Sequence, residues 1–515
     1  MFQFARLLPK TKKVLALLIW SITLLGFATS NLSNPNLWFD EALQLWASRG
    51  QHHYSNYDTP EPDSLKDVIA ANYSNTWDPP AFTLALHFLG KITGQLWIFR
   101  TLTLLLFYLS LLLFTRLAQH WAPQYLISSI AGLILFLSPL LCHYAFEIRP
   151  YMLELLHSAL AVYIVCRCDS TWSKKKTFFF AWALAFSMAS RYPSIFPALL
   201  CVGFMGCKFF YQPEHPKFFV LHKDKLIQFL LLFVPSLLVG ITIMILMAAN
   251  QWQVATAGNA YHQIFLIHAN PTEFFNWMTA ILWLPLITLL ALRLLPLKIF
   301  PEITRKYDLY IGFTLALNLL RLIIDFGRFI PYSLIFRFNL PCHTLLLFSY
   351  IPLLLTLLEY NALQLNSRIY LNHLVFVLYL LLIPGILFQA LCFTREDPDP
   401  SIRYLKKLPI DPPIKILTAI NAYPALRYAC EYGALNDRKH WREQIYFYGD
   451  KYPDRKDWIV REKFAFIISR SVEIDPIYYQ QAKRKQFNLI LESKNFLQGG
   501  KGKRPGLSTT IIKLD

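Results

Sequence analysis

Two adjacent carboxylates, Asp40 and Glu41, stand in segment 37–42, Leu-Trp-Phe-Asp-Glu-Ala, just after the first apolar run of the chain. A carboxylate at this place could act as a general base on a hydroxyl group. On a helix, adjacent side chains point about 100° apart, so the two cannot converge on one proton. One could face a reacting hydroxyl while the other orients a neighbour or binds a cation. The alternative is that Asp40 only caps a short amphipathic helix that runs to about Arg49. Three flanking aromatic residues are of the kind found at membrane interfaces: Trp38, Phe39 and Trp46.

A further carboxylate, Asp78, precedes the double proline Pro79-Pro80 and the apolar segment 81–89. The prolines block a helix before them and permit one after them. We therefore expect Asp78 in extended backbone at the entrance of a helix. It is either a site residue or the cap of that helix.

A third group of chemical residues surrounds Pro150, in the segment Glu147-Ile148-Arg149-Pro150-Tyr151. Pro150 disfavours helical backbone at Arg149, and in an extended chain Glu147 and Arg149 point to the same side. Charges at a membrane boundary are costly unless they are paired or used. The two residues are therefore either functional or a structural ion pair.

Two more arginines, Arg191 and Arg337, stand beside apolar runs. A guanidinium suits the recognition of a phosphate, because its fork of donors matches the phosphate oxygens. Each arginine could instead anchor its helix to lipid headgroups, which is the better account of Arg328.

These residues are set in a chain with a membrane composition. Of its 515 residues, 55% are hydrophobic and only 16% are charged, whereas soluble proteins run nearer a quarter charged. A helix crosses a bilayer in about 20 apolar residues. We predict eleven spans, at about 14–30, 97–115, 125–143, 151–166, 177–190, 194–210, 226–249, 277–295, 309–325, 338–358 and 371–393.

The basic residues predict the orientation of these spans. Lys and Arg gather in the segments that lie inside if the N-terminus is inside, as in other polytopic proteins. This accounts for much of the excess of 50 Lys+Arg over 32 Asp+Glu, so no nucleic-acid partner is expected. The predicted transmembrane domain covers 1–393, and its acidic first loop, 31–80, lies outside.

The composition changes after residue 393. Residues 394–515 are polar, aromatic and basic, and they predict a small soluble α/β domain on the outer side, with strands at 414–420 and 509–514 and a short helix at 425–432. The cysteines show no disulfide framework and no zinc-ligand spacing. The predicted fold class is thus mostly α, a polytopic helix bundle with an α/β C-terminal domain.

The ordered set of motifs resembles the polyprenyl-phosphate-sugar glycosyltransferases of the GT-C fold, which include protein O-mannosyltransferases and aminoarabinose transferases of lipid A. Segment 38–41 looks like the family's first-loop acidic motif, and segment 78–82 looks like its His-Pro-Pro-Leu-Tyr segment. Segment 147–151 is similar to its Glu-x-Arg-Pro-Tyr segment, and segment 336–341 to its Arg-Tyr…Pro helix start. Two positions differ, because Asp78 stands where a His is usual and Arg191 where a His-Tyr pair is frequent.

The resemblance implies an integral enzyme of a bacterial inner membrane that transfers a sugar from a polyprenyl phosphate to a hydroxyl of an extracytoplasmic glycan, lipid or protein, with inversion. It implies Asp40 as general base, with Glu41 and Glu147 as further catalytic residues. The donor phosphate would bind Arg149, Arg191 and Arg337, and the substrates would contact Asp78, Tyr151 and Tyr192. No nucleotide cofactor is expected, since no glycine-rich phosphate loop is visible. A divalent metal is a further expectation, with Glu41 and His262 as candidate ligands; His52, His53 and His268 are other outer-face histidines.

Two other classes of protein remain open. A transporter or lipid-sugar flippase would also be polytopic, but such proteins often show internal repeats and charged mid-membrane helices. Here no repeat is visible, and the ionisable residues gather at one face, except Arg321 and Asp325. A catalytically dead scaffold whose outer domain binds a partner is the second alternative, which only an activity measurement excludes.

Overall fold

The computed structural model describes most of the chain up to residue 364 and separate pieces after it. The described residues are 9–32, 39–51, 64–75, 78–169, 172–210, 223–257, 277–294, 299–328, 340–364, 400–410, 415–418, 426–427, 429–430, 435, 437, 445–447, 466–469, 488–493 and 509–513. Several predicted features lie outside them: the span 371–393, Arg337, and His52, His53, His262 and His268.

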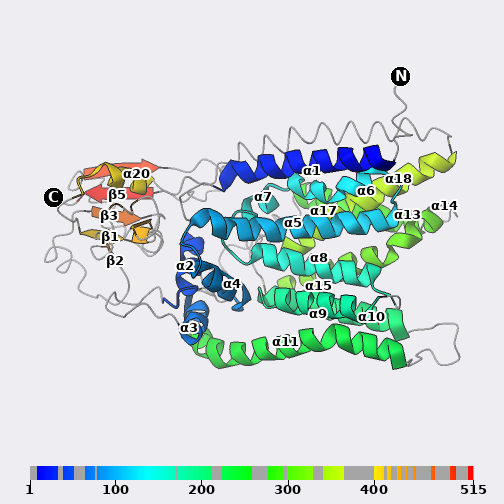
Figure 1. The fold of residues 1–515 in the computed structure, drawn as a ribbon, viewed down its shortest axis with the longest axis horizontal. Coiled ribbons are helices and arrows are strands. Elements are labelled where there is room, and N and C mark those ends of the chain that lie inside the picture. Colours follow the sequence, from blue (N-terminus) through cyan, green and yellow to red (C-terminus); the bar gives the residue numbers. More distant parts are fainter. Residues whose placement is uncertain are drawn as a thin grey trace, which may run out of the picture.

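Long helices lie side by side in one bundle (Figure 1). They are α1 (Pro9–Asn31), α5 (Leu96–Trp121), α8 (Tyr151–Arg167), α9 (Lys174–Met188), α10 (Ile195–Phe210), α11 (Lys223–Ala257), α13 (Trp277–Leu294), α15 (Asp308–Arg328), α17 (Leu340–Phe348) and α18 (Tyr350–Gln364). Within the described residues, four helical segments are long and apolar enough to cross a membrane: Leu96–Trp121, Tyr192–Phe210, Asp224–Ile243 and Leu340–Tyr360.

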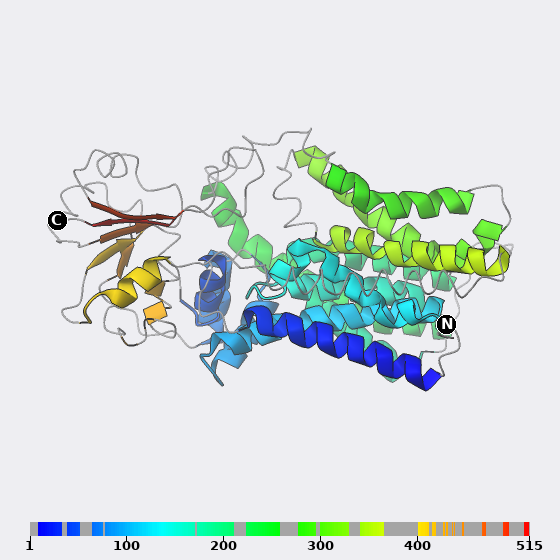
Figure 2. The same ribbon diagram turned by 90° about the horizontal axis from the view of Figure 1, so that it is seen from above.

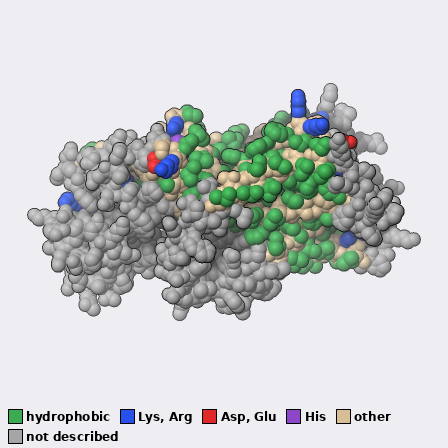
Figure 3. All heavy atoms as spheres, turned by 90° about the horizontal axis from the view of Figure 1, so that it is seen from below, with side chains coloured by type: hydrophobic (Ala, Val, Ile, Leu, Met, Phe, Trp, Pro, Cys, Tyr) green, Lys and Arg blue, Asp and Glu red, His purple; other side chains and the backbone are tan. Residues whose placement is uncertain are grey.

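The outside of the bundle is apolar. Side chains such as Leu237, Ile241 and Ile245 of α11 are exposed, and hydrophobic side chains cover the long side of the bundle in Figure 3. In water such a surface would be costly, whereas lipid tails are as apolar as the side chains themselves. The chain is therefore an integral membrane protein.

Aromatic side chains fill the bundle between α1, α5 and the segment after α5. The ring of Phe27 lies 4.7 Å from Phe136 and 4.7 Å from Phe146, and Phe107 lies 5.4 Å from Phe136, measured between centroids. All four are nearly fully buried. Their packing fixes α1 against the part of the chain that carries Glu147 and Arg149.

The segment predicted as one span at 125–143 is divided into three pieces: α6 (Leu126–Ile130), the 3-10 helix η2 (Ala131–Leu137) and α7 (Pro139–Tyr144). Two contacts explain the division. The Gly132 amide donates to Thr115 Oγ1 at 2.9 Å, so this backbone approaches α5 closely. Ser138 then starts a new helix, since its hydroxyl accepts from the Leu141 amide and a proline follows it.

Three short helices cover one end of the bundle: α2 (Phe39–Ala47), α3 (Leu65–Asn75) and α4 (Ala81–Gly90). They form a small core with the starts of α5 and α8, made of Ala42, Leu45, Phe82, Leu86, Leu96, Phe99, Ile148 and Leu153. The predicted first loop, 31–80, thus contains the helices α2 and α3. The short elements α14 (Ile299–Thr304), η3 (Tyr192–Ser194) and η5 (Arg305–Tyr307) complete the helical part.

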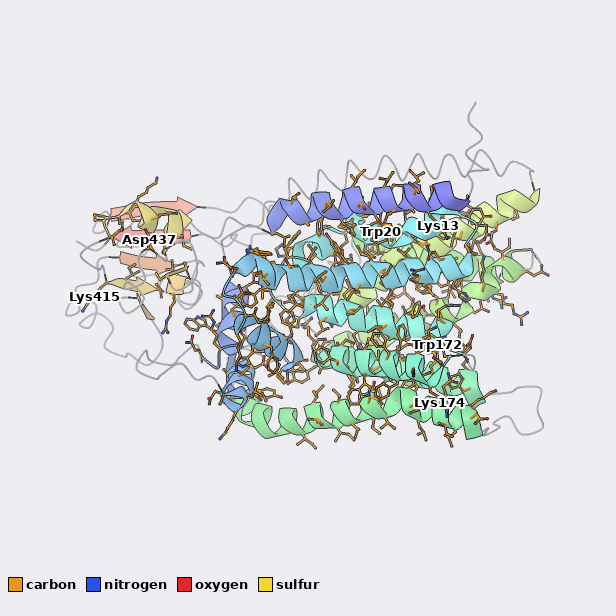
Figure 4. The ribbon with its side chains drawn as sticks, in the orientation of Figure 1. Lys13, Trp20, Trp172, Lys174, Lys415 and Asp437 are labelled. Atoms are coloured by element: carbon orange, nitrogen blue, oxygen red, sulfur yellow. The ribbon has the colours of Figure 1, made fainter. Side chains whose placement is uncertain are left out.

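The two ends of the bundle carry the segments that the charge pattern assigned to opposite sides. Lys13, Trp172 and Lys174 lie toward one end, whereas α2, α3, α4 and the C-terminal strands lie at the other (Figure 4). This grouping agrees with the predicted topology. Which end faces the cytoplasm stays a prediction.

The described residues from Pro400 onward, here called the C-terminal unit, contain α20 (Pro400–Lys407) and a five-stranded sheet. The strands are β1 (Ile416–Thr418), β2 (Ile445–Phe447), β3 (Phe466–Ser469), β4 (Asn488–Ser493) and β5 (Thr509–Lys513). Their order is β2-β1-β3-β5-β4, with β1 parallel to β2 and β3, and β5 antiparallel to β3 and β4. β1 and β5 lie within the predicted strands. Half of the predicted helix 425–432 is described, and those residues, 426, 427, 429 and 430, are helical. The sheet lies beyond α2 and α3 (Figures 1 and 2).

Candidate active site

Helix α2 brings Asp40 to the end of the bundle. Asp40 is the second residue of the helix and so lies inside its first turn. The capping alternative required Asp40 to precede the first turn. The position of its side chain is outside the described part. Residues 41–48 are all buried, and Trp46 keeps 1% of its surface exposed. Trp46 is therefore enclosed by protein, and its expected place at the membrane interface is wrong.

Glu41 joins α2 to two other segments. Its Oε1 accepts a hydrogen bond from the Ile148 amide at 2.9 Å, and its Oε2 lies 3.8 Å from Arg100 Nη2. Both Glu41 and Arg100 are fully buried. A guanidinium beside this carboxylate competes with a metal ion for it, and His262, the other candidate ligand, lies outside the described residues, so the expected metal site stays a prediction. Within the described ranges no three His, Cys, Asp or Glu residues could hold a metal together.

Arg100 is a site residue that the motif analysis missed. It lies in the first turns of α5, in an apolar run that was interpreted only as a span. A permanently charged side chain in such a run requires a partner, and this is the signal that could have found it.

Asp78 lies between two guanidiniums. Its Oδ1 accepts from Arg191 Nε at 3.4 Å, and its Oδ2 lies 3.7 Å from Arg149 Nη2. Helix α4 begins at Ala81 after Pro80, as the double proline predicted, and has no side-chain cap. The alternative that Asp78 caps this helix is therefore wrong. The Asp78 carbonyl accepts from Asn72 Nδ2 at 2.5 Å, which fixes the turn against α3.

Arg191 is held by a short ion pair. It has extended backbone between α9 and η3, and its Nη1 donates to Glu154 Oε2 at 2.6 Å. Burial alone would lower the pKa of Arg191, but Glu154 and Asp78 outweigh it and raise the pKa above its ordinary value. Arg191 is thus charged at any physiological pH. Glu154, in the first turn of α8, is a second residue that the motif analysis missed.

The polar side-chain contacts of Arg149 to other described residues are long. Its Nη1 donates to Gln44 Oε1 at 3.4 Å, and its pair with Asp78 is at 3.7 Å. Its Nε is buried and has no hydrogen-bond partner within the described part of the chain. The structural ion pair with Glu147, one of the two alternatives for this segment, is not formed. Instead, the Arg149 amide donates to the Glu147 carbonyl at 2.7 Å, which makes a turn. The two side chains therefore do not project together from an extended chain.

Glu147 lies on the other side of this turn. Its Oε2 is 3.5 Å from His143 Nε2, one helical turn earlier in the chain. The side chain is nearly buried, as are the turn residues around it. Glu147 thus belongs to the same region as Arg149 without being its ion-pair partner.

Tyrosine rings complete the site. The guanidinium carbon of Arg191 lies 4.8 Å from the centroid of Tyr151, and that of Arg149 lies 5.9 Å from it. The rings of Tyr144 and Tyr151 lie 4.4 Å apart. Tyr192 opens η3, directly after Arg191. These rings shield the guanidiniums from water on one side and add a favourable contact with their charge.

The structure thus joins most of the described candidates into one group. Glu41, Asp78, Arg149, Tyr151 and Arg191 are linked directly or through Gln44, Ile148 and Glu154, from segments far apart in the sequence. Gln44 also bonds Thr83 at 2.6 Å, and Thr83 bonds Asn72, so α2, α3 and α4 share one polar network. Such a network holds its charged side chains in fixed positions.

Comparisons with known proteins extend this description. No family model matches the chain, and no curated protein matches it by sequence. Among solved structures, ArnT from Cupriavidus metallidurans in the apo state is similar, with a TM-score of 0.50 and 12% identity over 97% of this chain and 98% of that one. ArnT bound to undecaprenyl phosphate gives a TM-score of 0.47 and 12% identity, covering 96% and 97%. Along nearly its whole length, the chain therefore has a GT-C-type fold like that of apo ArnT.

Proposed function

We propose that the protein is a membrane glycosyltransferase that moves a sugar from a polyprenyl phosphate to a hydroxyl group of an extracytoplasmic acceptor. The fold shared with ArnT supports the class. The observation that carries the proposal is the state of Arg149: it is 9% exposed, and among the described residues its polar side-chain contacts are long, at 3.4 Å to Gln44 and 3.7 Å to Asp78. Arg191 is bound to Glu154 at 2.6 Å, so Arg149 is the cation that can exchange its partner for a phosphate.

The reaction assigned to the site is an in-line displacement. Asp40 accepts the proton of the acceptor hydroxyl while the oxygen of that hydroxyl bonds to the anomeric carbon of the sugar. The bond from that carbon to the phosphate oxygen breaks, and its electrons leave with the polyprenyl phosphate. Attack from the side opposite the leaving group inverts the anomeric centre.

The residues around Asp40 have separate tasks in this proposal. Arg149 meets the negative charge that grows on the leaving phosphate, a form of stabilisation that works best in a site without water. Arg191 orients Asp78 and stacks on Tyr151, and Arg337 is a further proposed phosphate ligand. Glu41 holds α2 against the Ile148 turn, so we assign it to positioning and not to proton transfer.

Two features of the chain support this reaction over transport. The charged residues of the site are concentrated at one end of the bundle, beside α2 and α4, instead of along a path through it. Ion pairs also tie them to one another and join α2 to α5, and α8 to the turns of Asp78 and Arg191, which suits a rigid site more than one that opens alternately to both sides. The sugar and the acceptor are left open.

The test is release of polyprenyl phosphate from a panel of polyprenyl-phosphate sugars by the purified protein with a mixed acceptor extract. Asp40→Asn keeps the size of the side chain but removes the proton acceptor. We expect turnover to fall roughly 10²- to 10⁴-fold while the protein stays folded in detergent. Normal turnover by Asp40→Asn would refute the assigned base. Transport of the polyprenyl-phosphate sugar across a membrane without its cleavage would favour a flippase.

A further inference from the structure

The last turn of α2 is covered by a cation from a remote part of the sequence. The guanidinium carbon of Arg427, in the C-terminal unit, lies 5.1 Å from the centroid of the Trp46 ring. Trp46 keeps 1% of its surface exposed and Arg427 keeps 4%. Because the contact is shielded from water, its contribution is roughly 5- to 30-fold in an equilibrium constant.

Trp46 and Glu41 lie on different sides of α2. Glu41 and Gln44, three residues apart, point toward the bundle, where they contact the Ile148 turn and Thr83. Trp46 is five residues beyond Glu41 and so about 140° around the helix axis. The helix is therefore held from two directions, by the bundle through Glu41 and by the C-terminal unit through Trp46.

Position 40 lies on the remaining side of the helix. It is about 100° from position 41 and about 120° from position 46. A rotation of this nine-residue helix would move position 40 by a comparable angle, and the contacts of Glu41 and Trp46 both oppose such a rotation. The burial of every residue from 41 to 48 agrees with a helix that is enclosed on several sides.

We propose that the C-terminal unit positions the active site, with Arg427 holding α2 in register through the face of Trp46. This rests on the proposed function, since the helix carries Asp40. Arg427 is a positioning residue: it acts on the reaction through α2 and does not touch the substrate. The C-terminal unit is thus a working part of the transferase, although its sheet lies beyond the bundle (Figure 2).

The experiment is a double-mutant cycle in the full-length protein. Arg427→Ala and Trp46→Leu each remove one side of the contact, and the double variant removes both. Each single variant should lower kcat roughly 5- to 30-fold, with the KM for the donor changed less than about two-fold. The double variant should lose no more than the larger single loss, because the contact is already absent.

Two further variants separate positioning from general damage. Arg427→Lys keeps a cation that can stack on the ring, so it should recover part of kcat. Lys407→Ala removes an exposed cation of the same unit, on α20, and should leave kcat unchanged. Near-wild-type kcat in Arg427→Ala, a loss confined to KM, or losses that multiply in the double variant would each overturn the proposal.

A protein without any turnover would instead overturn the proposed function. The same cycle is then measured by thermal unfolding in detergent. Non-additive shifts of the unfolding midpoint would support the contact between the C-terminal unit and α2. Additive shifts would refute that contact.

Discussion

The contact between Glu41 and Arg100 gives the sharpest test of how the site is held. Glu41→Gln removes the negative charge but keeps an oxygen for the Ile148 amide, which Glu41 accepts at 2.9 Å. Arg100 stays buried and charged, since arginine does not lose its proton, and it loses the Glu41 carboxylate as a partner. Removing one partner of a buried ion pair lowers the free energy of unfolding by roughly 3–5 kcal/mol. The 3.8 Å separation between Glu41 and Arg100 places this pair at the lower end of that range.

The assay is thermal unfolding of the purified protein in detergent, with turnover measured on the same samples. Glu41→Gln should unfold well below the wild type. Replacing both partners, as Glu41→Gln with Arg100→Met, should restore much of the loss, because a buried pair replaced by apolar or neutral groups is often tolerated. If Glu41 were instead a catalytic acid or a metal ligand, Glu41→Gln would lose turnover without loss of stability, and Arg100→Met would not rescue it. That result would refute the positioning role.

Three other predictions follow from the packing, the site and the topology. Gly132→Ala should destabilise the protein by about 1–3 kcal/mol in thermal unfolding, because the new methyl would lie 2.1 Å from the Leu111 carbonyl oxygen. Gly203→Ala is the matched control, because its methyl would meet nothing within 4 Å. Arg149→Ala should lower donor turnover far more than it lowers the unfolding midpoint, and Arg149→Lys should recover only part, because a point charge cannot replace the guanidinium fork; equal loss of both properties would make Arg149 structural. A cysteine at Lys175 should react with an impermeant thiol reagent only from the cytoplasmic side and one at Asp454 only from the outer side, and the reverse labelling would invert the topology.

The sequence was sufficient for the frame of the fold because local rules determine it. Apolar runs indicated the helices, and the prolines gave the helix starts: α4 follows Pro80 and α8 follows Pro150. The break at Arg191 also lies where the sequence predicted it, between α9 and η3. The division of 125–143 was missed, because it depends on a tertiary contact between Gly132 and Thr115.

The candidate site was predicted only in part for a similar reason. Its members could be named from charge and motif, but their partners lie far away in sequence; Asp78 and Arg191 are 113 positions apart. Arg100 and Glu154 were hidden in apolar runs that gave no local sign of a partner. Trp46 looked like a membrane-interface residue because the sequence beside a span reads the same whether lipid or protein covers its aromatic side chains.

The order of these charges along the chain has a consequence for the biogenesis of the protein. In each ion pair of the site the carboxylate is synthesised before its guanidinium: Glu41 before Arg100, Asp78 before Arg149, and Glu154 before Arg191. A carboxyl group can wait near lipid in its neutral, protonated form, whereas an arginine keeps its charge. Each of these three arginines therefore enters the membrane region when its carboxylate partner has already been synthesised.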